Sequence, residues 1–267
     1  MKIKDETLGM WLGVLGVACF AITLPMTRLA TGTQAAPQLS PWFVTLARAA
    51  LAGGLSTVFL LVTRSPRPAR HHWKSLALTM LGTVIGYPLL LGYALRVVTA
   101  SHAAVITALL PLMTAAVAAW LLHQRARLGF WLCSVAGSAL VVLFSVLRAR
   151  QGGASFGFEW ADVLLVGAVF AASFGYIFGA KITPALGAER VICWVCVLAL
   201  PVTLPGALWL WPQHAVAASA WGGLLYVGVF SMWAGFFAWY RGLMLGGALR
   251  VSQVQLLQPF LSILAAI

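Results

Sequence analysis

The chain has 267 residues, of which 62% are hydrophobic and only 8% are charged, and its mean hydropathy is +0.96. Lys and Arg total 17 against 5 Asp and Glu, which gives a formal net charge of +12. A basic soluble protein spreads its cations among many other polar groups, so this composition indicates a membrane protein. It argues against nucleic acid as the partner that explains the positive charge.

Long apolar stretches between the charges predict the membrane spans, because about 20 apolar residues cross the hydrocarbon layer as a helix. The first stretch is expected to be a retained helix rather than a cleaved signal peptide, since its flank carries as many acids as lysines. The sequence therefore predicts an all-α, polytopic membrane helix bundle. Nine spans are expected, at Leu8–Thr27, Trp42–Val62, Ser75–Leu95, His102–Leu122, Phe130–Leu147, Ala161–Ala180, Val191–Leu210, Trp221–Tyr240 and Ala248–Ile267.

The distribution of Lys and Arg predicts how the bundle is oriented. If the N-terminus is cytoplasmic, the inside segments hold 12 of these residues and the outside segments hold 4, with Arg48 left inside a span. Cytoplasmic loops carry such an excess of cations. We therefore predict a multi-pass protein of the cell inner membrane with a cytoplasmic N-terminus.

Acidic residues and cysteines limit the chemistry that the spans can support. The acids lie in tails, loops or the first turn of a span, which argues against a proton relay through a carboxylate at mid-membrane. They are Asp5, Glu6, Glu159, Asp162 and Glu189. Cys193 and Cys196 form a CxxC pair, but no second ligand pair lies nearby and an apolar environment disfavours thiolates. No metal or cofactor is expected.

Weak internal similarity predicts two repeats. Aligning Ala94-Leu95 with Gly242-Leu243 places Pro111 on Pro259, each within a span that follows a short turn. The offset contains five spans, an odd number, so the second copy is expected to be inverted relative to the first. The repeats are assigned to residues 1–150 and 151–267, with the linker at 148–159. The second would contain four helices, so we expect this sequence to be a truncated form of a ten-helix protein.

Several short motifs resemble the EamA-like branch of the drug/metabolite transporter superfamily. They are Pro41 with Arg48-Ala49-Ala50-Leu51-Ala52, Tyr93-Ala94-Leu95, Ala100-Ser101-His102-Ala103-Ala104, Pro111-Leu112, Gly129 with Ala136-Gly137, and Gly242-Leu243 with Pro259. The resemblance implies two inverted five-helix repeats and the export of small metabolites. This chain departs from the family at Leu122-His123-Gln124-Arg125, where members often carry an acid, and in having nine predicted helices.

Five polar or aromatic residues within spans are predicted to contact a substrate: Arg48, Tyr87, Tyr176, Trp233 and Gln255. A guanidinium inside a span is costly unless it is paired or hydrated. Two interpretations of Arg48 stay open: it attracts a carboxylate, or it has a structural role, in which it snorkels to the nearer water surface or binds carbonyls at a helix end. Gln255 likewise either binds a polar substrate or bridges to a neighbouring helix.

Other residues within or near the spans are expected to have structural roles. Trp239 and Tyr240 lie near a span end, which predicts that they belong to the aromatic belt at the membrane interface. The same role is expected for Trp42, Trp73, Trp160 and Trp221. Glycines four residues apart predict close helix contacts, at Gly9 and Gly13, Gly82 and Gly86, Gly175 and Gly179, and Gly242 and Gly246. His102 begins a span near the predicted outer face, where a histidine either titrates in the physiological range or is merely interfacial, and the interfacial role is expected.

The function favoured by these features is an integral membrane carrier that moves small metabolites, such as amino acids, by alternating access. Its partners would be a small-molecule substrate and the lipid bilayer. Assembly of two copies into a homodimer is a further possibility that the sequence leaves open. Two alternatives are an intramembrane transferase and a membrane assembly subunit that transports nothing. An enzyme needs paired catalytic groups at a membrane face. Only His71-His72 offers such a pair, within a basic loop, so the chain is predicted not to be an enzyme.

Overall fold

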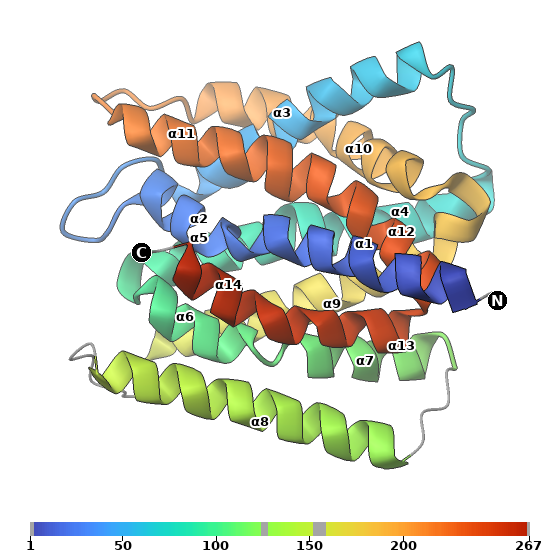
Figure 1. Ribbon diagram of the computed structural model, residues 1–267. Coiled ribbons are helices and arrows are strands. Elements are labelled where there is room, and N and C mark those ends of the chain that lie inside the picture. Colours follow the sequence, from blue (N-terminus) through green and yellow to red (C-terminus); the bar gives the residue numbers. More distant parts are fainter. Residues whose placement is uncertain (1–2, 124–127, 152–158, 266–267) are drawn as a thin grey trace.

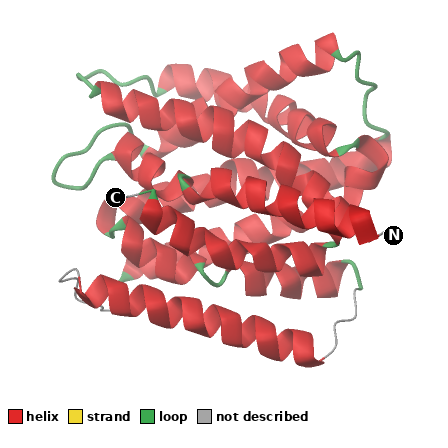
Figure 2. Ribbon diagram, viewed as in Figure 1, coloured by secondary structure: helices red, strands yellow, loops and turns green. Residues whose placement is uncertain are grey.

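A computed structural model of the protein describes residues 3–123, 128–151 and 159–265 (Figure 1). It is 86% helix, and the described residues contain no strand (Figure 2). The predicted all-α fold is therefore confirmed. The predicted segments Leu122–Arg125 and Arg148–Glu159 lie partly outside the described residues.

The first four predicted spans are each helical, and three of them are divided into shorter helices. The first contains α1 and α2, the second is α3, the third runs from η1 to α5, and the fourth contains α6 and α7. Their bounds are α1 Ile3–Ala21, α2 Thr23–Thr31, α3 Pro41–Val62, η1 Arg70–His72, α4 Trp73–Thr79, η2 Met80–Gly86, α5 Tyr87–Val97, α6 Ala100–Thr107 and α7 Leu110–Leu121.

The remaining spans contain three long uninterrupted helices and two divided ones. Their elements are α8 Leu128–Gln151, α9 Trp160–Leu186, α10 Ala188–Trp209, α11 Ala218–Tyr226, η3 Val227–Ala234, α12 Gly235–Gly246, α13 Ala248–Ser252, η4 Gln253–Leu257 and α14 Gln258–Leu264. Within the described residues, 7 helical stretches are long and apolar enough to cross a membrane. The helix α8 packs against α6, α7 and η4 at one edge of the bundle (Figure 1).

Glycine pairs bring two sets of helices into backbone contact, as the sequence predicts. A Cβ on Gly9 of α1 would lie 2.3 Å from the nitrogen of Gly246, and one on Gly242 would lie 2.9 Å from the nitrogen of Gly13. On the other side of the bundle, a Cβ on Gly82 would lie 2.9 Å from the Cα of Gly175. These glycines therefore allow α1 to pack on α12 and η2 to pack on α9.

The first span bends where Pro25 interrupts its hydrogen bonding. Proline has no N–H, so the carbonyl of Ala21, four residues earlier, loses its partner in the helix. The helix breaks at Ile22, between α1 and α2. The hydroxyl of Ser262 on α14 donates to the Ala21 oxygen at 2.5 Å and satisfies the freed carbonyl. A polar contact to the last span thus stabilises the bend.

Two π-helical segments, η2 and η3, lie at equivalent positions of the third and eighth spans. In each, an N–H bonds to the carbonyl five residues earlier: Tyr87 donates to Gly82, and Gly235 donates to Phe230. A Cβ on Gly235 would lie 2.8 Å from the Phe230 oxygen, and one on Gly86 would lie 2.8 Å from the Leu81 oxygen. Glycine is thus required for the wide turns. π-Helical turns are rare and frequently mark functional sites.

Ion pairs show which turns lie at the same end of the bundle. Arg250 donates to Glu6 at 2.7 Å, and Arg241 donates to Glu189 at 3.4 Å. The N-terminus, the α9–α10 turn and the α12–α13 turn therefore share one end, which is at the right in Figure 1. We call this the N-terminal end of the bundle. At the opposite end, Arg28 on α2 donates to the carbonyls of Leu95 and Val98 where α5 finishes.

Candidate functional site

A cavity lies in the middle of the bundle, where the bend of the first span meets the two π-helical segments. Its walls come from α1, α2, α3, η2, α5, α9, η3 and α12. Its volume is small, with room for about one water molecule. We call it the central cavity, and the residues that line it are Phe20, Thr23, Arg48, Thr83, Tyr87, Ala172, Tyr176, Ser231 and Phe236. All of them are buried.

The local breaks in the helices explain why polar groups gather there. Thr23 follows the break at Ile22, Thr83 lies on η2, and Ser231 lies on η3. Thr83 uses its hydroxyl to donate to the Thr79 carbonyl at 2.8 Å, which leaves its oxygen able to accept another hydrogen bond. Small hydroxyl side chains thus reach the cavity from three spans in which the helix is irregular.

Arg48 is the charged residue of the central cavity. Its side chain is buried, with 2% of the residue exposed, so the snorkelling interpretation is wrong. Its Nη2 donates to the Ser231 Oγ at 3.1 Å, and that oxygen lies 2.8 Å from the Thr23 Oγ1. Its Nε and Nη1 have no hydrogen-bond partner among the described residues. The guanidinium therefore retains donors that no described protein group uses.

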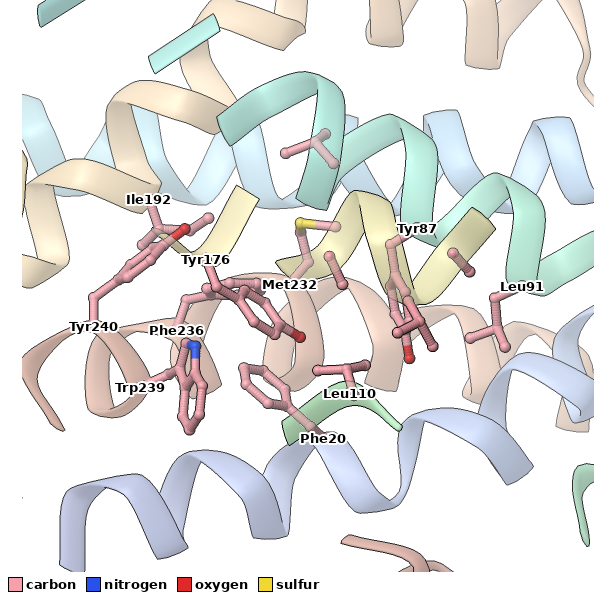
Figure 3. Packing of buried hydrophobic residues seen from close by; sticks show 14 of the residues in the cluster. Phe20, Tyr87, Leu91, Leu110, Tyr176, Ile192, Met232, Phe236, Trp239 and Tyr240 are labelled. Carbon is pink, nitrogen blue, oxygen red and sulfur yellow. The ribbon is translucent and has the colours of Figure 1, made fainter. Parts of the chain in front are cut away.

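Tyr87 and Tyr176 line the same cavity as Arg48, from α5 and α9. Figure 3 shows the Tyr176 ring beside Phe20 of α1, and the Tyr87 ring on the other side of Leu110. The Phe20 ring centroid lies 6.3 Å from that of Tyr176, with the two rings nearly parallel. Three of the five predicted site residues thus come together, although their contact with a substrate stays a prediction.

The side of the cavity nearer the N-terminal end is closed by rings that we call the aromatic cluster. It consists of Phe20, Tyr176, Phe236, Trp239 and Tyr240 (Figure 3). The ring centroids of Phe20 and Phe236 are 5.0 Å apart, and those of Tyr176 and Trp239 are 5.4 Å apart. Trp239 and Tyr240 are fully buried, so their assignment to an interfacial belt is wrong. They face the core because the glycine contacts draw α12 against α1 and α9.

Trp233 and Gln255, the other two predicted site residues, do not line the central cavity. Trp233 packs on the α3 side of η3, with its ring centroid 4.8 Å from that of Phe237 and 6.3 Å from that of Phe59. Gln255 lies on η4, where it is 1% exposed. Neither of its amide atoms has a hydrogen-bond partner among the residues that the structure describes.

Sequence reasoning missed the hydroxyls of Thr23, Thr83 and Ser231 and the ring of Phe20. Small hydroxyl residues and phenylalanine are common in apolar helices, so their types alone do not predict a site. One signal was available for Thr23, because Pro25 lies two residues away and predicts an irregular helix at that position.

Residues 7–146 and 159–267 match the model of the EamA-like transporter family. The chain belongs to this family. The EamA-like chain is also 41% identical over 265 residues to the uncharacterized transporter YdeK of Bacillus subtilis (strain 168), covering 98% of this chain and 89% of the relative.

A solved crystal structure shares the fold of this EamA-like chain. It superimposes with a TM-score of 0.72 at 19% sequence identity, covering 96% of this chain and 87% of the other. The family and the named relative identify the protein as a membrane transporter of the drug/metabolite transporter type. The EamA-like chain is therefore a multi-pass membrane protein.

Proposed function

We propose that this EamA-like transporter exports small polar or amphipathic metabolites, amino acids among them, across the cell inner membrane by alternating access. The observation that carries the proposal is the buried Arg48 on the wall of the central cavity. A buried charge without an opposite charge is costly, and in membrane spans such groups mark substrate or ion pathways. A substrate that supplies the missing partner would recover this cost.

The closed state of the central cavity supports alternating access. The aromatic cluster covers one side, and at the opposite end of the bundle Arg28 holds α2 against the end of α5. The cavity has room for about one water molecule, so a metabolite enters only after the helices part on one side. Transport then requires each closure to open in turn.

Direction and orientation rest on separate arguments. Export is inferred from the family resemblance. The cytoplasmic N-terminus is inferred from the excess of Lys and Arg in the segments assigned to that side. On this orientation the aromatic cluster is the closure that faces the cytoplasm, and Arg28 belongs to the outer closure.

The test is transport by the full chain reconstituted in liposomes, measured as counterflow of radiolabelled amino acids and organic acids. We expect saturable exchange of at least one compound, and its loss in Arg48→Met. The matched control is Arg241→Met, which removes an exposed arginine at the end of the bundle and is expected to retain the exchange. If no member of either compound class exchanges faster than in protein-free liposomes, the proposed function is wrong.

A further inference from the structure

The charge around the central cavity is positive and unbalanced. Among the described residues, no acidic side chain lines it. Glu6, Asp162 and Glu189 are paired with Arg250, His102 and Arg241, respectively, at distances of 2.7, 2.6 and 3.4 Å. Asp5 lies in the first turn of α1, and Glu159 is the N-cap of α9. The charge of Arg48 is therefore left to be balanced by a ligand.

The groups beside Arg48 form a set of hydrogen-bond donors. Its Nη2 can only donate, so the Ser231 Oγ accepts that bond. Ser231 and Thr23 then share one hydrogen between their oxygens, and whichever residue donates it, the other hydroxyl hydrogen stays free. Together with the unused Nε and Nη1 of Arg48, this wall offers three donor atoms to an anion. A carboxylate only accepts hydrogen bonds, so it fits this wall.

The rest of the cavity is mostly apolar. Phe20, Ala172, Tyr176 and Phe236 contribute apolar surface to its lining. The rings of Phe20 and Phe236 are tilted against each other, with their centroids 5.0 Å apart. Such rings suit an aliphatic or aromatic body, because apolar surface gains free energy on leaving water. The free donors and the apolar lining together match a molecule with a carboxylate at one end and an apolar body at the other.

An amino acid would add an ammonium group to a cavity that already holds a positive charge. The Tyr87 and Tyr176 hydroxyls and the Thr83 oxygen could accept hydrogen bonds from it, but none of these groups carries a negative charge. A zwitterion has no net charge, so its complex with Arg48 would keep a net charge of plus one in the cavity. A monoanion would bring that net charge to zero. Repulsion between like charges is strong where water is excluded.

We propose that the preferred substrates of the central cavity are monocarboxylates with an apolar or aromatic body and a net charge of minus one, ahead of zwitterionic amino acids and of amines. This inference rests on the proposed function, which places the substrate in the central cavity. The carboxylate binds Arg48, Ser231 and Thr23, and the body lies against Phe20, Tyr176 and Phe236.

Three compounds with one body separate the charge states. 3-Phenylpropionate carries the carboxylate alone, phenylalanine carries both groups, and phenethylamine carries the ammonium alone. Binding to the full chain in lipid nanodiscs is measured by calorimetry at neutral pH, where the carboxylates are ionised. We expect 3-phenylpropionate to bind about 10-fold or more tightly than phenylalanine, and phenethylamine not to bind measurably. Equal or tighter binding of phenylalanine overturns the inference.

Variants test whether Arg48 is the origin of the preference. Arg48→Met should abolish binding of 3-phenylpropionate, Arg48→Lys should keep the order of the three compounds, and Ser231→Ala should weaken 3-phenylpropionate binding several-fold. Arg241→Met is the control and should bind all three as the natural chain does. If Arg48→Met fails to fold, the affinities of Arg48→Lys and Ser231→Ala for the three compounds still test the assignment. An unchanged affinity in Ser231→Ala, or a preference for phenylalanine in Arg48→Lys, contradicts the assignment.

The inference and the proposed function can fail separately. Counterflow of phenylalanine in liposomes together with tighter binding of phenylalanine leaves the transporter standing and removes the monocarboxylate preference. Selective binding of 3-phenylpropionate with no counterflow of any organic acid or amino acid keeps the site and removes the transport proposal.

Discussion

The Nε2 of His102 and the Oδ1 of Asp162 lie 2.6 Å apart and join the start of α6 to the start of α9. Both side chains are largely buried, with 9% and 12% exposed. The other oxygen of Asp162 accepts the backbone N–H of Glu159 at 3.1 Å, which completes a capping box at the start of α9. One carboxylate therefore caps a helix and binds a histidine on another span.

Replacing Asp162 by asparagine should destabilise the bundle, because the amide keeps the size of the side chain but loses its charge. We expect the free energy of unfolding to fall by about 2 kcal/mol. Reversible unfolding in mixed detergent micelles measures the change. Glu189→Gln is the matched control, since its partner Arg241 is 55% exposed, and it should cost less than about 1 kcal/mol. Equal losses of unfolding free energy in the two variants would show that the buried pair of Asp162 and His102 stabilises the protein no more than the exposed pair does.

Adding a methyl group at Gly9 should disrupt the contact of α1 with α12. The new Cβ would lie 2.3 Å from the nitrogen of Gly246, so the helices must separate. We expect Gly9→Ala to lower the free energy of unfolding by about 1–3 kcal/mol. A Cβ at Gly54 meets no atom within 4 Å, so Gly54→Ala should be neutral or stabilising by up to about 1 kcal/mol. A stable Gly9→Ala protein would contradict this close packing.

Removing the hydroxyl of Ser262 should leave the Ala21 carbonyl without a partner at the bend of the first span. Ser262→Ala is expected to lower the free energy of unfolding by about 1 kcal/mol. Hydrogen exchange of the amides near Ile22 should also become faster. Ser219→Ala, at an exposed serine at the start of α11, is the comparison and should change neither measurement. Unchanged exchange in Ser262→Ala would mean that Pro25 needs no support from α14.

Loss of the Arg28 side chain should loosen the closure opposite the aromatic cluster, because the carbonyls of Leu95 and Val98 lose a charged donor. The readout is maleimide labelling of a cysteine placed at Thr83, in a background in which the natural cysteines are replaced. We expect Arg28→Met to speed labelling about 10-fold, which corresponds to a shift of about 1.4 kcal/mol in the opening equilibrium. Arg250→Met, at the N-terminal end, should leave the rate unchanged. The same acceleration in both variants would rule out a local closure at Arg28.

The sequence predicted features that depend on local composition. Apolar length predicted the 7 helical stretches that, among the described residues, can cross a membrane. Glycine spacing predicted close helix contacts at Gly9 and at Gly246, because residues four apart lie on one face of a helix, but it did not predict that these two glycines meet. The same reasoning selected Arg48, since a charge within an apolar stretch stands out in the sequence. It could not decide between the cavity and the water surface, because that depends on the neighbouring helices.

Features that depend on contacts between distant segments were not predicted. The hydroxyls of Thr23 and Ser231 meet across 208 positions of sequence, and no local pattern pairs them. Trp239 was assigned to the membrane interface from its place near a span end, but the face of α12 on which it lies turns it into the core. The pair of His102 and Asp162 was missed for the same reason, since each residue separately looks like the end of a helix.

The two π-helical segments make the lining of the central cavity depend on helix pitch. Each residue of an α-helix turns the chain by about 100° about the helix axis. An extra residue in a π-helical turn therefore changes the direction in which all later side chains of that helix point. Tyr87 is the first residue after η2, and Phe236 is the second residue after η3. If one wide turn tightened to α-helical geometry, the ring beyond it would rotate away from Arg48 while the span stayed continuous. Such a change of pitch in the third or eighth span would alter which side chains line the central cavity by rotation about the helix axis, without sideways movement of the span.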